Sequence, residues 1–585
     1  MVRQQPLYFL SPFNWNIGGV VTPEKVLVTS AWPYINVTPH LGNLVGSVLS
    51  ADVAARYYRL RGDDVLMVSG SDTHGTPIEV EALKEGITPK ALTDRNHAKV
   101  AALFKKWEAS YDNYTSTESA VHKEFVQQHL MKIYKNGYIF SQDTQMLYCE
   151  HDQRFLPDRF VEGKCPYCTY EHARGDQCDR CGRLLEGTLL EPRCVICGNT
   201  PTLKTTKHWY IDLSRFSDQL TKFIKENKQL PSNAKNFSLN WIEEGLKPRA
   251  VTRDVEWGIP APFPGAENKT VYVWVDAVLG YISATIEQCQ HLGTPEKWRD
   301  FWFNKNSKTL YFVGKDNIPF HTIILPALLL ASGEEYNLPW NVSATEFLQF
   351  KGEKASKSRK IGIWIDEALE MFSVDYWRFF LMATRPEMKD TNFSWDFFIE
   401  KINADLNDTY GNFIHRTLTF IDSKFNGEVP KPTKLDVDDE MVLNTINEKV
   451  ETVAEELEAS KLQSAANTLI SISRVGNQYL NEKEPWKLLK TDPEKAATIF
   501  YVAAQIVKAL AVTSAPFIPG SAQKIWQTLS LSGNIEKTRW DEAKTRLEPE
   551  HKISKPTPLF QKISCNEAEL DEMLMKIREK AAKSA

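Results

Sequence analysis

The sequence predicts an α/β protein in which a parallel-sheet domain is interrupted by a cysteine-rich insertion and followed by an α-helical bundle. Three observations support this prediction. Strand-like and helix-like segments alternate over residues 25–72, seven of the nine cysteines lie between Cys149 and Cys197, and apolar residues recur three and four positions apart from about residue 396 onward. Alternating strands and helices are typical of parallel sheets, whereas a sustained helical period is typical of bundles.

The first strand-like segment is KVLVTSA, residues 25–31, which is apolar and rich in β-branched residues. A loop follows, then an apolar segment at helical spacing that ends at Gly62, then a second strand over residues 64–72. This order opens a Rossmann-type sheet, whose ligands bind beyond the carboxyl ends of the strands. Residues 270–278 and 309–317 are expected to form two further strands, each ending in an acidic loop.

Composition shifts along the chain predict the domain limits. The expected parts are a sheet domain in two halves (1–140 and 246–350), an insertion (141–245), a connecting region with a basic loop (351–395), a helical domain (396–545) and a charged, solvated tail helix (546–585).

Charge and cysteine spacing restrict the class of protein. The net charge is only -5, so a nucleic acid would have to be held by local basic patches. The CxxC pairs indicate metal ligands in a reducing compartment, the cytoplasm, rather than disulfides. The chain shows no uninterrupted apolar run of about 18 residues and no signal-peptide pattern, so we expect no membrane span.

One segment, KGEKASKSRKIG (351–362), carries five basic side chains that repel one another and cannot be buried. A solvated linker is the simplest interpretation of such a loop. However, it follows the last expected strand, so it can fold over the same strand ends as His40 and Asn43, which precede the first helix. Lys354 and Lys357 can then neutralise the charge on a leaving pyrophosphate, while His40 and Asn43 donate to a phosphate at the helix start. The pattern predicts a triphosphate site.

These residues carry a family resemblance. The strings HLGN (40–43) and KASKS (354–358) stand where class I aminoacyl-tRNA synthetases have their HIGH and KMSKS signatures. Further strings make the chain similar to methionyl-tRNA synthetases of the archaeal and eukaryotic-cytosolic type: SAWPYINVTPHLGN, GSDTHGTPI, VTRDVEWGIP, VYVWVDAVLGYIS and VGKDNIPFH, in this order. Ala355 and Lys360 depart from the usual residues of that loop, so we expect its packing to differ.

The resemblance implies a methionine–tRNA ligase. Such an enzyme activates L-methionine with ATP to methionyl-adenylate, with Mg²⁺ on the phosphates, and transfers it to the 3′ end of tRNA(Met), initiator tRNA included. Two alternatives stay open: a class I synthetase for another apolar or sulfur-containing amino acid, and a catalytically silent relative that binds tRNA. We expect a monomer, with a tRNA-binding partner acting in trans as an alternative.

The resemblance also implies roles for particular residues. The catalytic set is His40, Asn43, Arg253, Lys354 and Lys357. The ATP-binding set is His40, Gly42, Asn43, Asp316, Lys354, Ser356 and Lys357. The methionine-binding set is Ala31, Tyr34, Asp72, Trp274, Ala277, Val278, Tyr281, Phe320 and His321, and its rings suit a thioether. The anticodon-binding set is Asn412, Arg416 and Trp486, which combine a stacking face with hydrogen-bonding groups.

Two groups of cysteines are candidate metal sites. One group has the spacing of a zinc knuckle and predicts a structural Zn²⁺ bound by four thiolates: Cys165, Cys168, Cys178 and Cys181. A second Zn²⁺ is predicted from Cys149, Cys194 and Cys197, completed by His151 or Asp152. An empty second site is the alternative, because Asp152 stands where the resemblance leads us to expect a cysteine.

Overall fold

A five-stranded parallel sheet forms the centre of the first domain. The computed structural model describes residues 23–175, 178, 180, 185, 189–353, 355 and 361–584. The strands lie in the order β14 (Asn341–Thr345), β13 (Lys308–Gly314), β1 (Lys25–Ser30), β2 (Asp64–Ser71) and β3 (Asn113–Ser116). All four pairings are parallel, so the carboxyl ends of the strands meet at one edge. The predicted Rossmann-type sheet is confirmed.

The helix after the first strand also agrees with the sequence. A short turn α1 (Leu41–Asn43), a π-helical turn η1 (Leu44–Val48) and α2 (Leu49–Arg61) run on from one another. The helix ends at Gly62, whose φ of 98° is in the left-handed region that glycine adopts without a steric cost. An added Cβ at Gly62 would also overlap the guanidinium of Arg539. Both the backbone conformation and the space at this position therefore require glycine.

The strand expected over residues 270–278 is wrong. Only β12 (Thr270–Val271) is extended there, and the rest forms the first turns of α8 (Val273–His291). The alternating valines at 271, 273 and 275 imitate a strand, but this end of α8 is buried on nearly every side. A helix that is apolar all round cannot be told from a buried strand by its pattern over so short a run.

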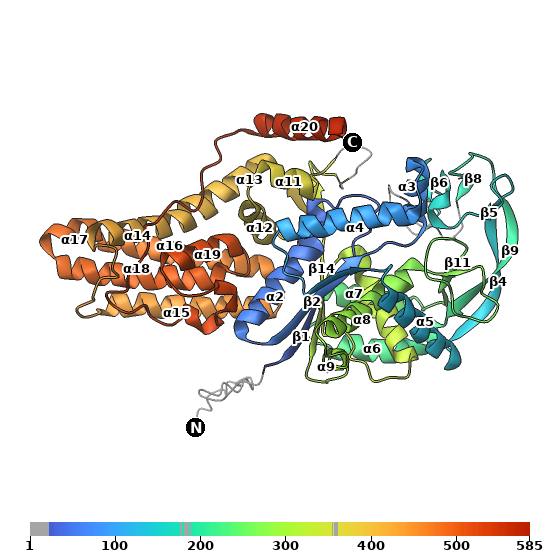
Figure 1. Ribbon diagram of the computed structural model, residues 1–585, viewed down its shortest axis with the longest axis horizontal. Helices are drawn as coiled ribbons and strands as arrows, with labels where there is room; N and C mark the ends of the chain where they lie inside the picture. The colour runs from blue at the N-terminus through green and yellow to red at the C-terminus, as the bar shows by residue number, and fades with distance from the viewer. Residues whose placement is uncertain are drawn as a thin grey trace, which may run out of the picture.

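The insertion extends from the sheet domain on a long antiparallel pair, β4 (Ile139–Cys149) and β9 (Thr202–Ile211). Beyond it lies a small three-stranded sheet of β6 (Val161–Lys164), β7 (Ala173–Arg174) and β8 (Leu190–Cys194), at the right of Figure 1. After β9 the chain returns: α6 (Ser217–Glu226) and α7 (Ser232–Glu243) bury side chains in the same core as the sheet.

The second half of the chain is helical, as predicted. Its main helices are α14 (Asn412–Lys424), α15 (Val437–Glu458), α16 (Leu462–Lys483), α18 (Pro493–Ser514) and α19 (Pro519–Thr528), which form the elongated body at the left of Figure 1. By length and composition alone α18 could cross a membrane, but 94% of its apolar window is buried inside the fold. It is the central helix of the bundle.

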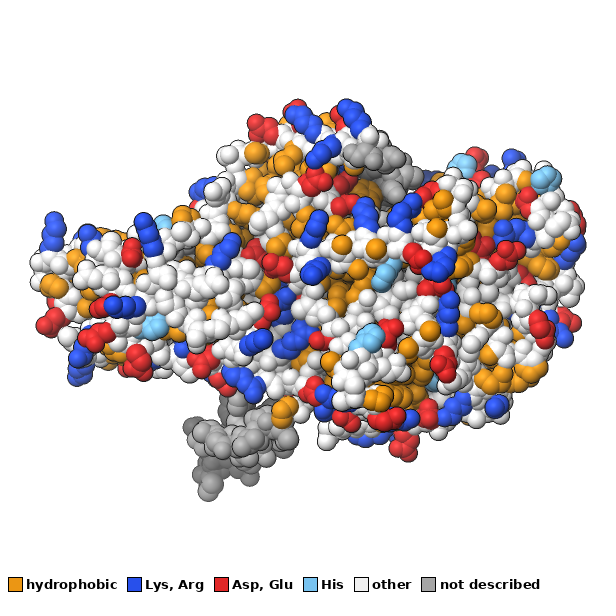
Figure 2. All heavy atoms as spheres, viewed as in Figure 1, with side chains coloured by type: hydrophobic (Ala, Val, Ile, Leu, Met, Phe, Trp, Pro, Cys, Tyr) orange, Lys and Arg blue, Asp and Glu red, His pale blue; other side chains and the backbone are white. Residues whose placement is uncertain are grey.

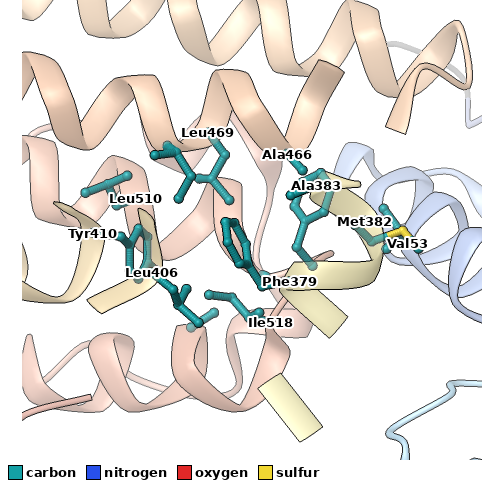
Figure 3. Packing of buried hydrophobic residues seen from close by; sticks show 14 of the residues in the cluster. Val53, Phe379, Met382, Ala383, Leu406, Tyr410, Ala466, Leu469, Leu510 and Ile518 are labelled. Atoms are coloured by element: carbon teal, nitrogen blue, oxygen red, sulfur yellow. The ribbon is translucent and has the colours of Figure 1, made fainter. Parts of the chain in front are cut away.

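One continuous core joins the bundle to the sheet domain. Figure 3 shows Val53 of α2 beside Met382 of α12 (Val374–Ala383), and Phe379 of α12 among bundle residues such as Leu469 and Ile518. A buried ion pair crosses the same boundary, because the Arg378 guanidinium of α12 donates to Asp52 of α2 over 2.6 Å. The bundle is therefore held firmly against the sheet domain.

The C-terminal helix α20 (Glu567–Ser584) is not the solvated tail that its charge suggested. It crosses back over α11 (Ile365–Met371) and α13 (Trp395–Lys401), as Figure 1 shows, and Figure 2 shows hydrophobic side chains gathered below it. Leu570 and Leu574 are buried. Leu570 and Leu574 are four residues apart, so they share one face of α20, and this face packs against α11 and α13.

Candidate active site

A cavity of about 370 Å³ opens beyond the carboxyl ends of β1, β2 and β13. Every described residue of the predicted ATP and methionine sets lines it: Ala31, Tyr34, His40, Gly42, Asn43, Asp72, Trp274, Ala277, Val278, Tyr281, Asp316, Phe320 and His321. Lys354, Ser356 and Lys357 lie outside the described residues. Ala355, which stands between them in the chain, is described and also lines the cavity.

His40 caps the helix that begins at Leu41. Its Nδ1 accepts a hydrogen bond from the Gly42 N–H over 3.0 Å, and its own N–H donates to Asn43 Oδ1 over 3.1 Å. Burial lowers the pKa of His40 to about 4, so the ring is neutral at pH 7. Because Nδ1 is the acceptor, the ring proton sits on Nε2. His40 can therefore donate a hydrogen bond without carrying a charge.

The imidazole of His40 leaves no space for a side chain at Gly42. A Cβ at this position would lie 2.8 Å from His40 Cε1 and 2.9 Å from Nδ1. Contacts that short do not occur, so any side chain at position 42 would push the ring out of its capping position. Glycine is needed here so that the imidazole can keep its capping position.

The apolar side of the cavity is built largely on one face of α8. Trp274, Ala277, Val278 and Tyr281 are spaced by three and four residues, so a helix brings them together, whereas the expected strand would have divided them between two faces. Trp274 stacks on Phe320 with ring centroids 4.4 Å apart and planes inclined by 16°. Rings and small aliphatic groups thus line a slot for an apolar side chain.

A short hydrogen-bond chain closes the back of this slot. The Tyr281 hydroxyl and His321 Nε2 are 2.7 Å apart, and His321 Nδ1 is 2.8 Å from the Asn317 carbonyl oxygen. Since a carbonyl only accepts, Nδ1 carries the ring proton and Nε2 accepts from the tyrosine. Burial lowers the pKa of His321 to about 4, so this wall of the cavity is polar but uncharged at pH 7.

Asp72 lies at the end of β2 and is 2% exposed. Burial, and then the charge of Asp276, raise the pKa of its carboxyl well above the usual range, although the nearby His74 opposes this. A buried carboxylate in this position requires a cation. The cavity therefore has a strong preference for a ligand with a positive group at this point.

Sequence reasoning missed the residues that surround Asp72. His74 lies between two carboxylates, with Nδ1 3.0 Å from Asp276 Oδ2 and Nε2 2.9 Å from Glu118 Oε1. Burial disfavours its charge, but Asp276 and Glu118 outweigh this and raise the pKa of His74 to about 9. The string GSDTHG offered a signal, because His74 follows Asp72 by two positions; nothing in the sequence pointed to Asp276 or Glu118 as its partners.

Arg253, the remaining described member of the catalytic set, does not line the 370 Å³ cavity. It lies on β11 (Thr252–Arg253), with its guanidinium 3.5 Å from the ring centre of Tyr272. Tyr272 lines a second cavity of about 230 Å³, whose wall shares Tyr34 and Trp274 with the first. Arg253 thus lies beside this second cavity rather than in the wall of the first.

The second cysteine group comes together with Asp152. The sulfurs of Cys149, Cys194 and Cys197 and an oxygen of Asp152 lie within 4.8 Å of one another. Asp152 Oδ2 is 3.2 Å from Cys149 Sγ and 3.0 Å from Cys194 Sγ. His151 is exposed and contacts Oδ1 of Asp152 instead, over 3.0 Å. Of the two alternatives that the sequence left open, Asp152 is the one that faces the sulfurs.

The first cysteine group has the matching turn geometry. The ligand atoms of Cys165, Cys168 and Cys178 lie within 4.8 Å of one another, and Cys181 is outside the described residues. In the CxxC turns that begin at Cys165 and Cys194, the N–H two residues on donates to the first sulfur over 3.4 Å. Such donors stabilise a thiolate and leave its other lone pairs for a metal. The two clusters could each hold a metal ion.

Helix α17 (Pro485–Thr491), which carries the predicted anticodon residue Trp486, lies at the end of the bundle that is far from the sheet domain (Figure 1). The Arg416 guanidinium of α14 lies 4.2 Å from the ring centre of Trp486 on α17 (Pro485–Thr491) and donates to Asn481. Asn412, one turn before Arg416, is exposed. Trp486 is half-buried rather than fully exposed, because it packs against the bundle core on one side.

Comparison with known proteins agrees with this geometry. The family model described as "tRNA synthetases class I (M)" matches residues 26–418, and the "Anticodon binding domain of methionyl tRNA ligase" matches residues 429–577. The methionine–tRNA ligase of Thermofilum pendens is 54% identical over 95% of this chain and 98% of its own. That of Aeropyrum pernix is 51% identical over 95% and 98%.

Solved structures give the same answer. Mycobacterium tuberculosis methionyl-tRNA synthetase, solved with methionyl-adenylate bound, superposes with a TM-score of 0.76 at 25% identity and covers 92% of this chain and 100% of its own. Both halves of the chain are matched, and the described signature residues line the same cavity. The chain therefore belongs to the methionyl-tRNA synthetase family of class I aminoacyl-tRNA synthetases, whose members activate methionine with ATP and charge tRNA.

Proposed function

We propose that this chain forms methionyl-adenylate in the 370 Å³ cavity and transfers the methionyl group to tRNA(Met), initiator tRNA included. The observation that carries this proposal is the convergence of the described ATP and methionine sets on one cavity, in a fold shared with a synthetase solved with methionyl-adenylate. The catalytic problem is to position two substrates and to stabilise the charge that develops on the phosphates.

The amino acid lies with its side chain against α8. The stacked Trp274 and Phe320 give a polarisable wall for the thioether, and each sulfur–ring contact contributes about 0.3–1.5 kcal/mol. Tyr281 and His321 close the end of the slot with a neutral hydrogen-bond chain. At the other end Asp72 holds the ammonium group.

ATP lies between the helix start and the basic loop. The neutral His40 donates from Nε2 to a phosphate oxygen, and Asn43 and Asp316 contact the nucleotide from either side of the cavity. Lys354 and Lys357 neutralise the charge on the leaving pyrophosphate, Ser356 contributes to ATP binding, and Mg²⁺ accompanies the phosphates. Arg253, beside the second cavity, stabilises the adenylate.

The metal clusters are structural. We assign Zn²⁺ to the four thiolates of Cys165, Cys168, Cys178 and Cys181, and a second Zn²⁺ to Cys149, Cys194, Cys197 and Asp152, with His151 as a hydrogen-bond partner of Asp152. The apolar core of this module is small and includes several of the cysteines themselves, so the metal ions supply much of what holds it together. Four ligands leave no open position for catalysis.

The bundle reads the anticodon. A base stacks on Trp486, which is partly exposed, while Arg416 and Asn412 contact base edges. The expected state is a cytoplasmic monomer, with a trans-acting tRNA-binding partner as the alternative; light scattering of the purified protein distinguishes a monomer from a dimer.

The test is ATP–pyrophosphate exchange with single amino acids. Methionine should support exchange, and isoleucine and cysteine should not. Lys357→Ala should slow exchange at least about 100-fold, the scale of losing one preorganised charge contact. A preference for isoleucine or cysteine would favour another class I synthetase, and no exchange with any amino acid would favour a silent tRNA-binding relative.

A further inference from the structure

A buried charge network lies behind the amino-acid end of the cavity. Asp72 and His74 come from the end of β2, Asp276 from α8 and Glu118 from the loop after β3. His74 is 0% exposed and contacts both Asp276 and Glu118 within 3.0 Å. Its backbone N–H approaches Asp72 Oδ1 at 3.4 Å. Two buried carboxyl groups, a buried imidazole and the partly exposed carboxyl of Glu118 therefore lie close together.

The neighbouring elements add one more charge. Lys123 of α5 (Ala120–Lys135) forms an ion pair with Glu118 over 2.6 Å. His122, beside it, is kept neutral because burial, together with the charges of His74 and Lys123, lowers its pKa to about 3. Burial raises the pKa of Tyr281 far above its usual range, so its hydroxyl stays protonated. Trp257 covers His74 with ring centroids 5.9 Å apart.

The network has a deficit of one positive charge. Asp72, Glu118 and Asp276 contribute three negative charges when ionised, and the protonated His74 and Lys123 contribute two positive ones. One ammonium group brought by a ligand to Asp72 makes the set neutral. Without the charge on His74 the deficit would be two, and a buried pair of carboxyls in that state keeps a proton instead of ionising fully.

Asp276 strengthens the dependence of carboxyl ionisation on the charge of His74. It is 0% exposed, and its Oδ1 has no hydrogen-bond partner among the described residues, so His74 is the main support for its charge. The charge of Asp276 in turn acts on Asp72 and disfavours its ionisation. The ionised fraction of Asp72 therefore depends on His74 directly and through Asp276.

We propose that His74 is a positioning residue for amino-acid binding, because its charge opposes the effects of burial and of Asp276 on Asp72 and so favours the ionised carboxylate that receives the ammonium group. This inference rests on the proposed role of Asp72. His74 has no contact with the substrate itself: it does not line the cavity. It sets the electrostatic state in which the cavity accepts a zwitterionic amino acid without an accompanying proton transfer.

The decisive experiment measures KM for L-methionine in ATP–pyrophosphate exchange between pH 6.0 and 8.5. The wild type should show a nearly flat KM over this range. His74→Gln should raise KM for methionine about 10- to 100-fold at pH 7, since each unit by which a carboxyl pKa exceeds the pH costs tenfold in its ionised fraction. In the variant KM should fall as pH rises, because the ammonium must displace a proton, and KM for ATP should change less than about twofold.

Charge rescue separates this role from a structural one. The double variant His74→Gln/Asp276→Asn removes one positive and one negative charge and restores the deficit of one, so its KM for methionine should return to within about threefold of the wild type. His129→Gln is the matched control, because His129 is also buried and bonds the Leu328 carbonyl outside this network. It should leave KM for methionine unchanged.

The outcomes distinguish the inference from its premise. If Asp72→Asn leaves KM for methionine unchanged, the role of Asp72 is wrong, and the inference falls with it. If Asp72→Asn raises KM but His74→Gln moves neither KM nor its pH dependence, only the inference is overturned. A double variant as impaired as His74→Gln would also overturn it. His74→Asn replaces the glutamine variant if the latter shows no cooperative unfolding transition.

Discussion

Arg578 offers the sharpest test of how the C-terminal helix is docked. Its guanidinium donates to both oxygens of Glu367, over 2.7 and 2.9 Å, and to the Gly362 carbonyl oxygen over 2.6 Å. Gly362 directly precedes Ile363, whose carbonyl oxygen accepts from the Leu41 N–H next to His40. Arg578 of α20 thus contacts the segment at Gly362 and Ile363, and this segment is hydrogen-bonded to the start of the helix that His40 caps.

The expected cost of Arg578→Ala follows from these contacts. Charge-assisted hydrogen bonds contribute about 1.5–3 kcal/mol each when well buried. Partial exposure of Arg578 and the conformational entropy that its side chain loses in the docked state reduce the net contribution. We expect the free energy of undocking of α20 to fall by about 2 kcal/mol, equivalent to about 30-fold faster amide exchange in this helix.

Hydrogen exchange followed by mass spectrometry measures this directly on the peptide covering residues 567–584. Lys576→Ala is the matched control, since Lys576 lies on the same helix, is exposed and pairs only locally with Glu572. Pyrophosphate exchange should also slow several-fold in Arg578→Ala, because Gly362 loses its support. Equal protection of α20 in the two variants would refute the docking argument.

Three further predictions concern other parts of the molecule. Burial lowers the pKa of His129 and of His321 to about 4, whereas the unfolded chain binds these protons near pH 6.5. The free energy of unfolding should therefore fall as pH drops from about 6.5 to 4, and the melting temperature of His129→Gln should depend less steeply on pH over this range; an equal slope would contradict this. Elemental analysis should find two zinc ions per chain, one in Cys165→Ser and one in Cys194→Ser, and a single zinc in the wild type would argue against the cluster at Asp152. Trp486→Ala should lower kcat/KM for tRNA by about 10-fold or more, the value of one stacked base, while pyrophosphate exchange is unchanged; loss of exchange would point to a folding defect instead.

Much of the site could be predicted from local strings. The family resemblance of HLGN and of the segment around Trp274 implied that these residues contact the ligand, and most of them meet at one cavity: His40, Gly42, Asn43, Trp274, Ala277, Val278 and Tyr281. The reason is that each string lies at the end of a strand or on one helix face, so its position in the fold follows from the order of strands and helices. The element type of residues 273–278 was nevertheless wrong, because burial on all sides removes the periodicity that distinguishes a helix.

Other features depend on contacts between distant segments. Charge alone made α20 look like a solvated tail, but Leu570 and Leu574 find a surface formed by α11 and α13. Asp152 and His151 are equivalent in a sequence, and only the turn at Cys149 decides which of them faces the sulfurs.

The sequence by itself determined the parallel sheet, the helical bundle and two cysteine clusters that could each hold a metal ion, and its signature strings carried the family resemblance. These depend on short-range periodicity, residue spacing and local motifs, which one chain segment expresses alone. Only the tertiary structure decided which charges lie close together, as His74 does with Glu118 and Asp276 from segments 44 and 202 residues away. Electrostatic interactions of buried groups depend on distance and exclusion of water in three dimensions, and neither is written in the order of residues.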